Sequence, residues 1–152
     1  MKRTLTTLAL ILSAPAAFAQ EMTVTKAGEL AGQIGAAETF TGTAYVAPVF
    51  SPNMNDVSAG HVTFLPGARS AWHTHPAGQQ LGVTSGTGWT QERGGTCYII
   101  EAGDVVWCPP GVEHWHGATD KTAMSHYAIQ ASVDGSAVEW GPLVTDEEYH
   151  DH

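Results

Sequence analysis

The sequence predicts an all-β protein that folds as one small antiparallel barrel or sandwich. Short runs rich in β-branched and aromatic residues recur along the chain, without helical periodicity between them. Seventeen glycines and eight prolines imply many turns, which suits short strands better than helices. The roughly 130 residues that follow an N-terminal leader suit one domain with one hydrophobic core. We therefore expect a single β-barrel domain.

The expected strands follow one another closely, and turn-forming residues separate them. Pro48 limits the first strand and Pro66 stops the second, because proline donates no hydrogen bond to a sheet. Residues 86–88 are expected to close the fourth strand, and Gly94-Gly95 indicates a hairpin turn. Residues 145–148 are typical of the cap of one short helix. We expect strands over 41–46, 60–65, 72–75, 80–85, 89–93, 97–100, 105–108, 114–116 and 122–131, and a loop over 51–58.

The N-terminus has the three parts of a secretory signal peptide. Lys2 and Arg3 carry positive charge, residues 5–12 form an apolar centre, and residues 17–19 read Ala-Phe-Ala, a small-x-small cleavage site. The apolar run is shorter than the about 20 residues that span a bilayer. We expect a cleaved signal peptide over 1–19 and an exported, periplasmic protein, with a buried N-terminal helix as the alternative. The rest of the chain is divided into an N-terminal arm over 20–39, the barrel domain over 40–149 and a tail over 150–152.

Acidic residues dominate the chain that follows the leader. Without residues 1–19 it has four Lys and Arg against fifteen Asp and Glu, which is a formal charge of −11. Nucleic acids and anionic membranes attract basic surfaces, so neither is expected as a partner. We expect a small-molecule ligand or substrate instead.

Residues 72–79 contain a compact set of potential metal ligands. Successive side chains of a strand alternate between its faces, so His73 and His75 point the same way and are able to hold one ion. Pro76 and Gly78 then turn the chain, which brings Gln79 back toward the same ion. The best candidate for a further ligand lies elsewhere in the sequence, at His114.

This stretch resembles the first motif of the cupin family, whose fold is a small double-stranded β-helix, or jelly-roll, barrel. The family pattern is glycine, five residues, His-x-His, three or four residues, glutamate, six residues and glycine. Here it reads Gly67, His73, His75, Gln79 and Gly86, with every interval kept and glutamine in place of glutamate. The resemblance implies an all-β chain with a single cupin barrel.

A second stretch resembles the other cupin motif, which is glycine, five residues, Pro-x-Gly, two residues, histidine, three residues and asparagine. Here it reads Gly103, Pro109, Gly111 and His114, with Ala118 in place of asparagine. Two linked motifs at the correct spacing imply that one metal ion is held inside the barrel. The implied ligands are His73, His75, Gln79 and His114.

The glutamine narrows the resemblance to the bacterial cupin hydroxynitrile lyases, a manganese-dependent subgroup. The likeness runs over 40–149 and includes 66–69, 71–76, 103–107, 114–118, 122–126, 128–130 and 144–147. It implies a carbon–carbon lyase that cleaves or forms small α-hydroxynitriles from an aldehyde or ketone and cyanide. It further implies that His116 and His126 lie beside the metal, with His126 as the favoured general base, and that Gly60 and Val62 line the cavity. Small cupins often form homo-oligomers, and we expect a dimer or tetramer on that resemblance.

The ligand types also indicate what chemistry the site performs. Three neutral imidazoles and one neutral amide leave the charge of a divalent ion uncompensated, which favours stabilisation of an anion such as alkoxide or cyanide. Imidazole binds several transition metals, so the ligands do not distinguish Mn(II) from Fe(II), Ni(II) or Zn(II).

Further side chains are expected to point into the barrel beside the metal. His116 shares strand parity with His114, and His126 shares it with Gln130, so each pair faces the same way. Cleavage of a cyanohydrin needs a base for the hydroxyl proton and a positive centre for departing cyanide. We assign His126 as the base, Gln130 as a positioning hydrogen-bonder and His116 as its support. Leu81 is expected to line the cavity with Val62.

Several alternatives remain open at this point. Gln79 is either a ligand or a residue behind the ligands, and His116 and His126 are either catalytic or hydrogen-bonded core histidines. The chain is alternatively another metal-cupin enzyme, such as a dioxygenase, or an exported cupin that binds metal or a ligand without catalysis, because barrels host many functions. Cys97 and Cys108 either pair or remain buried thiols. The side chains assigned to surfaces or to packing outside the barrel are His61, Arg69, Trp72, Trp107 and Trp115.

Overall fold

The structure is a computed structural model that describes residues 22–52 and 55–151. The predicted signal peptide over 1–19 lies outside the described residues. Within the described part of the chain, no helix is long and apolar enough to cross a membrane.

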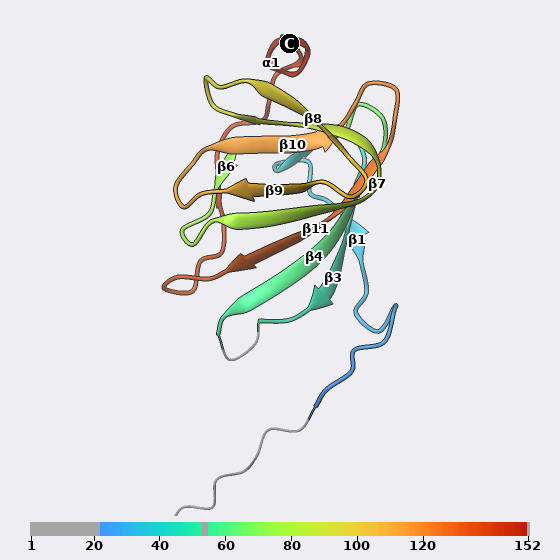
Figure 1. Cartoon of the computed structure of the whole chain (residues 1–152), viewed down its shortest axis with the longest axis vertical. Helices are drawn as coiled ribbons and strands as arrows, with labels where there is room; N and C mark the ends of the chain where they lie inside the picture. The colour runs from blue at the N-terminus through green and yellow to red at the C-terminus, as the bar shows by residue number, and fades with distance from the viewer. Residues whose placement is uncertain (1–21, 53–54, 152) are drawn as a thin grey trace, which may run out of the picture.

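Antiparallel strands make up about half of the described chain and curl into a barrel (Figure 1). One short helix, α1 (Asp146–His150), follows them and lies at one end of the barrel beside β8 and β10. The strands are β1 (Gln33–Ile34), β2 (Phe40–Thr41), β3 (Ala44–Phe50), β4 (Val57–Phe64), β5 (Arg69–Ser70), β6 (His73–Thr74), β7 (Gln79–Glu92), β8 (Cys97–Glu101), β9 (Val105–Cys108), β10 (His114–Ala118), β11 (Met124–Ala131) and β12 (Glu139–Trp140).

Strand β7 joins the two halves of the barrel. Its first half pairs with β9 and β11, and its second half pairs with β8 and β10. The prediction that residues 86–88 end a strand was wrong, because β7 runs through them for 14 residues. Gly86 has a φ of 74°, and a Cβ there would lie 1.9 Å from the carbonyl oxygen of Ala123. Glycine is therefore needed for a bend and a close approach, and not for a turn that stops the strand.

Several predicted boundaries also shift. Strand β4 begins at Val57, so the loop predicted over 51–58 ends earlier than expected. The predicted arm over 20–39 contributes β1, in which Gln33 pairs with Val46 of β3. The predicted helix cap is confirmed, because the Thr145 hydroxyl accepts a hydrogen bond from the Glu148 amide in a complete capping box.

Two hydrophobic clusters hold the barrel together. The larger cluster includes Phe64, Val83 and Met124, and its Phe64 ring packs against the imidazoles of His116 and His126. The smaller cluster lies outside the barrel wall, where Trp72 and Trp115 pack against Val144 and Tyr149 of the C-terminal segment. The tyrosine hydroxyl also donates a hydrogen bond to the carbonyl of Ala118 at 2.8 Å. The predicted packing of these two tryptophans outside the barrel is confirmed, and it occurs within one chain.

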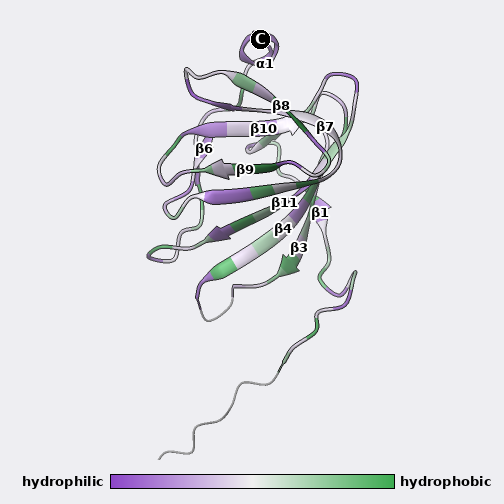
Figure 2. Ribbon diagram, viewed as in Figure 1, coloured by the Kyte–Doolittle hydropathy of each residue, from purple (hydrophilic) through white to green (hydrophobic). Residues whose placement is uncertain are grey.

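Strand β10 combines burial with polarity. Figure 2 shows its first residues as hydrophilic, yet all five residues of the strand are buried. Buried polar groups are costly unless they are paired, so a buried polar strand indicates a functional site.

The two cysteines are free thiols, Cys97 on β8 and Cys108 on β9. They pair with Gln91 and Gln79 respectively, which lie far apart along β7. Burial raises the pKa of both thiols to about 11. This agrees with the alternative of two partly or fully buried thiols rather than a disulfide.

Candidate metal centre

The residues of the two motifs meet inside the barrel. His114 of β10 lies directly opposite His73 of β6 in the antiparallel pairing. The candidate ligand atoms of His73, His114 and His116 lie within 4.8 Å of one another, and all three side chains are buried. His75 lies beside them, with its ring centroid 5.1 Å from that of His73. The structure thus forms a three-histidine site that is able to hold a divalent metal, with a fourth histidine in contact.

Backbone carbonyls orient three of these imidazoles. In each, Nδ1 lies within hydrogen-bonding distance of a carbonyl oxygen, so Nδ1 carries the proton and Nε2 presents its lone pair. This is the arrangement that histidine ligands usually adopt in metal sites. The three pairs are His73 with Ala71 at 2.9 Å, His75 with Ala137 at 2.6 Å and His114 with Val112 at 2.9 Å.

The side chain of Gln79 completes this group. Its Oε1 lies 3.4 Å from Nε2 of His114, and its Nε2 donates to Oε1 of Gln130 at 3.3 Å. Because Nδ1 of His114 carries the proton, the two facing atoms are both lone-pair acceptors. Nε2 of His75 is also buried and has no hydrogen-bond partner among the described residues. Facing acceptors and an unpartnered buried nitrogen fit a shared cation, so the residues present fit a bound metal.

Burial keeps the imidazoles neutral. It lowers the pKa of His75 to about 4, and it lowers the pKa values of His73 and His116 well below the usual 6.5. It also lowers the pKa of His114. At neutral pH these nitrogens therefore carry lone pairs, which is the state that a metal ligand requires.

A second pair of buried histidines consists of His116, which lines the cavity, and His126, which lies behind it. Nδ1 of His116 and Nε2 of His126 are 3.1 Å apart, and the other nitrogen of each ring has no hydrogen-bond partner within the described chain. The ring of Phe64 packs against both imidazoles, at 5.8 and 5.7 Å between centroids. Burial lowers the pKa of His126 to about 4. A neutral pair with one shared proton is able to accept a proton from a substrate.

The histidines border a cavity of about 150 Å³. His116 lines it, whereas His126 is 0% exposed and lies outside its lining. Gly60 and Val62 line it as predicted, but Leu81 does not. Leu81 is 0% exposed and lies on β7 where that strand pairs with β9 and β11. The prediction failed because strand parity does not determine which buried side chains border the cavity. The full lining is Phe40, Val46, Gly60, Val62, His73, His75, Gln79, His116, Ala128, Gln130, Val138 and Trp140.

Sequence reasoning missed two aromatic members of this lining. Phe40 and Trp140 lie on strands of two residues each, which are too short to show any periodicity. Their positions depend on pairing with β5 and β6, far away in the sequence. Both residues lie far outside the two motifs, which span 67–86 and 103–118, so motif spacing does not identify them.

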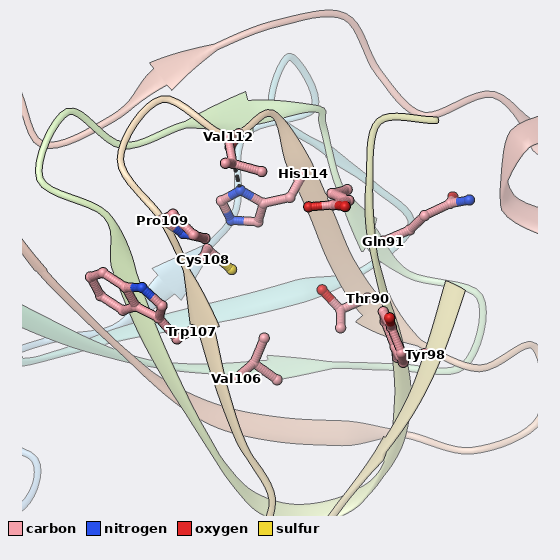
Figure 3. A pocket seen from close by; sticks show the side chains of 10 residues that line it. Thr90, Gln91, Tyr98, Val106, Trp107, Cys108, Pro109, Val112 and His114 are labelled. Carbon is pink, nitrogen blue, oxygen red and sulfur yellow. Dashed lines mark hydrogen bonds between the residues drawn. The ribbon is translucent and has the colours of Figure 1, made fainter. Parts of the chain in front are cut away.

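A second cavity of about 150 Å³ lies on the other side of His114 (Figure 3). Thr90, Trp107 and Cys108 line it, but the Thr90 hydroxyl is already bonded to the carbonyl of Trp115 at 3.0 Å. Of the candidate metal ligands, His114 alone borders this cavity. The open nitrogen of His114 approaches Gln79, so the candidate chemistry belongs to the first cavity.

Comparisons with known proteins agree with this arrangement. A family model described as "Cupin domain" matches residues 60–129. A protein from Granulicella tundricola named "(R)-mandelonitrile lyase" is 52% identical over 129 residues, which are 84% of this chain and 98% of that protein. A cupin-like protein from Thermotoga maritima superposes with a TM-score of 0.76 at 41% identity, over 79% of this chain and 92% of its own. A cupin-2 domain protein from Rhodospirillum rubrum has a TM-score of 0.65 at 15% identity over 86% of each chain, which is a likeness of fold alone.

The predicted fold is therefore confirmed by an antiparallel barrel, by both motifs meeting at its centre and by relatives that cover nearly the whole domain. The chain belongs to the cupin family.

Proposed function

We propose that this protein is a metal-dependent hydroxynitrile lyase that cleaves mandelonitrile-like substrates to an aldehyde and hydrogen cyanide. The observation that carries the proposal is the neutral His116–His126 pair next to a ligand set without a carboxylate. The relative from Granulicella tundricola, whose printed name is (R)-mandelonitrile lyase, supports the same reaction.

We assign the metal to His73, His75, Gln79 and His114, because the three imidazole rings lie against one another and the Gln79 amide oxygen faces Nε2 of His114. When bound, a divalent ion supplies a positive centre for an anionic oxygen or cyanide. Manganese is our proposal for its identity on the resemblance noted above, with iron, nickel and zinc as the alternatives that the same ligands accept.

The chain's own residues handle the proton. We assign the proton between the two rings to Nδ1 of His116, which lies 3.1 Å from Nε2 of His126. Nε2 of His116 then presents a lone pair to the cavity that it lines. That nitrogen takes the hydroxyl proton of the substrate, the C–CN bond breaks with its electron pair leaving on cyanide, and the C=O bond forms. The imidazolium then returns the proton to cyanide, which gives hydrogen cyanide. His126 acts through His116 in this scheme, whereas the resemblance alone favoured His126 as the base.

Gln130 positions the substrate in this proposal. Its side chain lines the cavity, accepts a hydrogen bond from Gln79 and donates one to the Ser58 hydroxyl at 3.3 Å. Both the oxygen and the nitrogen of its amide are therefore held in place. In this proposal the amide lies beside the hydroxyl group of the substrate.

We also propose that the protein is exported and works as a homo-oligomer. Export rests on the signal-like N-terminus, and assembly rests on the cupin resemblance. Large apolar side chains that are more than half exposed on β8 and β9 support assembly, because monomers rarely expose such patches. They are Tyr98, Ile99, Val105 and Trp107.

The test is cyanide release from mandelonitrile by the manganese-loaded protein without residues 1–19. Metal removal is expected to abolish release, and His116→Gln is expected to abolish it while the metal stays bound. His126→Ala is expected to lower it by on the order of 100-fold, the usual contribution of acid–base catalysis. If His116→Gln loses the metal instead, His116 is a ligand and the proton passes to His126.

Release at the buffer rate with metal bound contradicts the lyase proposal. Oxygen consumption by the iron-loaded protein would then indicate a dioxygenase. Absence of both activities would leave a protein that binds metal or a ligand.

A further inference from the structure

Two aromatic rings form one wall of the cavity that contains His116 and Gln130. Phe40 and Trp140 both line it, and their ring centroids are 5.8 Å apart in an edge-to-face arrangement. The Trp140 ring also packs on the imidazole of His73, at 4.9 Å between centroids. One side of the cavity is therefore aromatic, directly next to the candidate metal ligands.

Phe40 is held firmly in this position. It pairs with Ser70 across the β2–β5 ladder, and its amide donates to the carbonyl of Ala36 at 3.0 Å. Its ring packs on Phe64 at 6.0 Å between centroids, and a Cβ at Gly35 would lie 2.4 Å from it. The close approach of the backbone at this glycine leaves the ring little freedom to move away from the cavity.

Trp140 is tied to the segment that carries the ligands. It lies directly opposite His73 in the β12–β6 pairing, and the next amide, of Gly141, donates to the carbonyl of Trp72 at 2.7 Å. The carbonyl of Ala137, three residues earlier, accepts the hydrogen bond from His75. Segment 137–141 thus orients a metal ligand and the aromatic wall together.

The size and polarity of the cavity indicate what lies against this wall. Its volume of about 150 Å³ is close to that of an engineered apolar cavity known to bind benzene. Its lining contains no Asp, Glu, Lys or Arg, so it suits a neutral guest. Its other apolar members are aliphatic and small: Val46, Val62, Ala128 and Val138. The cavity thus has room for about one aromatic ring, with polar groups at the metal side only.

We propose that Phe40 and Trp140 bind the aromatic ring of the substrate and set a preference for aryl over small alkyl hydroxynitriles. The inference rests on the proposed lyase function, because the hydroxyl end of the substrate must lie toward His116 and Gln130. Both aromatic residues lie outside residues 60–129, the part that matches the cupin domain. The segment that matches the cupin domain therefore supplies the ligands and the proton acceptor, while the segments that flank it select the substrate.

The test compares Phe40→Leu and Trp140→Leu with Tyr127→Leu. Tyr127 is 43% exposed and Trp140 is 44% exposed, and the Tyr127 ring packs on His61 and does not line the cavity, so it is a matched control. For the metal-loaded protein, kcat/KM is measured with mandelonitrile and with lactonitrile, its small alkyl analogue. The dissociation constant of benzaldehyde is measured by calorimetry, which requires no turnover.

Each cavity variant is expected to lose on the order of tenfold in kcat/KM for mandelonitrile, mainly through KM, and about tenfold in benzaldehyde affinity. Lactonitrile turnover is expected to stay within about twofold, and Tyr127→Leu is expected to leave both nitriles and benzaldehyde affinity unchanged. Trp140→Phe keeps a ring in place and is expected to recover most of the loss. Metal content is measured for every variant, because Trp140 contacts His73.

Equal losses of kcat/KM for both nitriles at full metal content would contradict the proposal that Phe40 and Trp140 bind the ring of the substrate. Unchanged benzaldehyde affinity in both leucine variants would contradict it as well. If benzaldehyde binds with the expected variant pattern but no nitrile is cleaved, the wall stands as a ring-binding site and the lyase function fails.

Discussion

The inner and outer faces of the barrel wall at β6 and β10 carry different side-chain chemistry. Inside the barrel, His73 and His114 lie opposite each other as neutral imidazoles, each with Nδ1 bonded to a backbone carbonyl. Outside it, the residues just before them, Trp72 and Glu113, are joined by one guanidinium. Arg93 lies 4.0 Å above the Trp72 ring and forms a forked pair with Glu113.

This difference follows from strand alternation, which sends neighbouring residues to opposite faces. On the inner face the imidazole nitrogens have lone pairs that are able to bind a ligand. On the outer face the charged groups are already paired with one another. Arg69 also belongs to the outer face, because its guanidinium donates to the Val144 carbonyl and to Asp146 at the start of α1. Packing outside the barrel therefore positions the chemistry inside it.

The largest expected effect on stability is at the outer face. Trp115 is 0% exposed and packs in the cluster under the C-terminal segment. Trp115→Ala should lower the free energy of unfolding by about 3–5 kcal/mol, because the cavity it leaves cannot refill. Urea unfolding measures this. A loss below about 1 kcal/mol would mean that the outer face does not hold the barrel together.

The dependence of stability on pH tests the burial of neutral histidines on the inner face. The folded-state pKa values of His75 and His126 are about 4, below the 6.5 of an unfolded histidine. Between those values the unfolded chain binds protons that the folded chain does not, so stability is present above pH 6.5 and is lost as pH falls toward 4. Each pKa unit corresponds to about 1.4 kcal/mol, so His126 contributes up to about 3 kcal/mol of this loss.

The measurement is the unfolding free energy of the metal-free protein from pH 7 to pH 4. His126→Asn should show a shallower decline than the unchanged chain, since it removes one of the titrating groups. Parallel curves for the two proteins would contradict a buried neutral His126.

Substitutions of Arg93 test whether contacts on the outer face position the ligands on the inner face. Its side chain is 41% exposed, so its ion pairs with Glu113 and Glu148 contribute about 1 kcal/mol or less to stability. Arg93→Ala should nevertheless weaken manganese affinity by on the order of tenfold, because it releases the strands that align His73 and His114. Arg93→Lys should recover part of this loss. An unchanged dissociation constant in metal titration would show that the outer contacts do not position the ligands.

The smallest expected effect is at the helix cap. Thr145→Ala removes the hydroxyl that accepts from the Glu148 amide at 3.1 Å, which should cost about 1 kcal/mol. Metal affinity should be unaffected, because the loss of the cap leaves the contacts of Arg93 with Glu113 and Trp72 in place. Chemical unfolding and metal titration of the same sample check both statements.

The sequence predicted the parts of the site that local spacing determines. His73, His75, Gln79 and His114 come together as predicted, because two motifs at known intervals and simple strand alternation place them. The bend at Gly86 was missed, since the same glycine suits a turn and a close backbone approach. Local sequence does not distinguish these two uses.

The remaining errors have a common physical origin in long-range pairing. Phe40 and Trp140 reach the cavity through two-residue ladders with distant strands, which no periodic pattern reveals. Leu81 is buried but does not line the cavity, and strand alternation alone does not determine which buried side chains border a cavity. Sequence spacing therefore located the ligands, while strand pairing decided the shape of the cavity around them.

The most direct test of this account is the number of manganese ions bound per chain after loosely held metal is removed. The account predicts one ion in the unchanged protein, one in His61→Ala, whose ring bonds Thr84 outside the barrel at 3.0 Å, and none in His114→Ala. A His114→Ala protein that keeps its metal, or an unchanged protein that binds none, would contradict the central claim that the inner face of these strands is a metal centre.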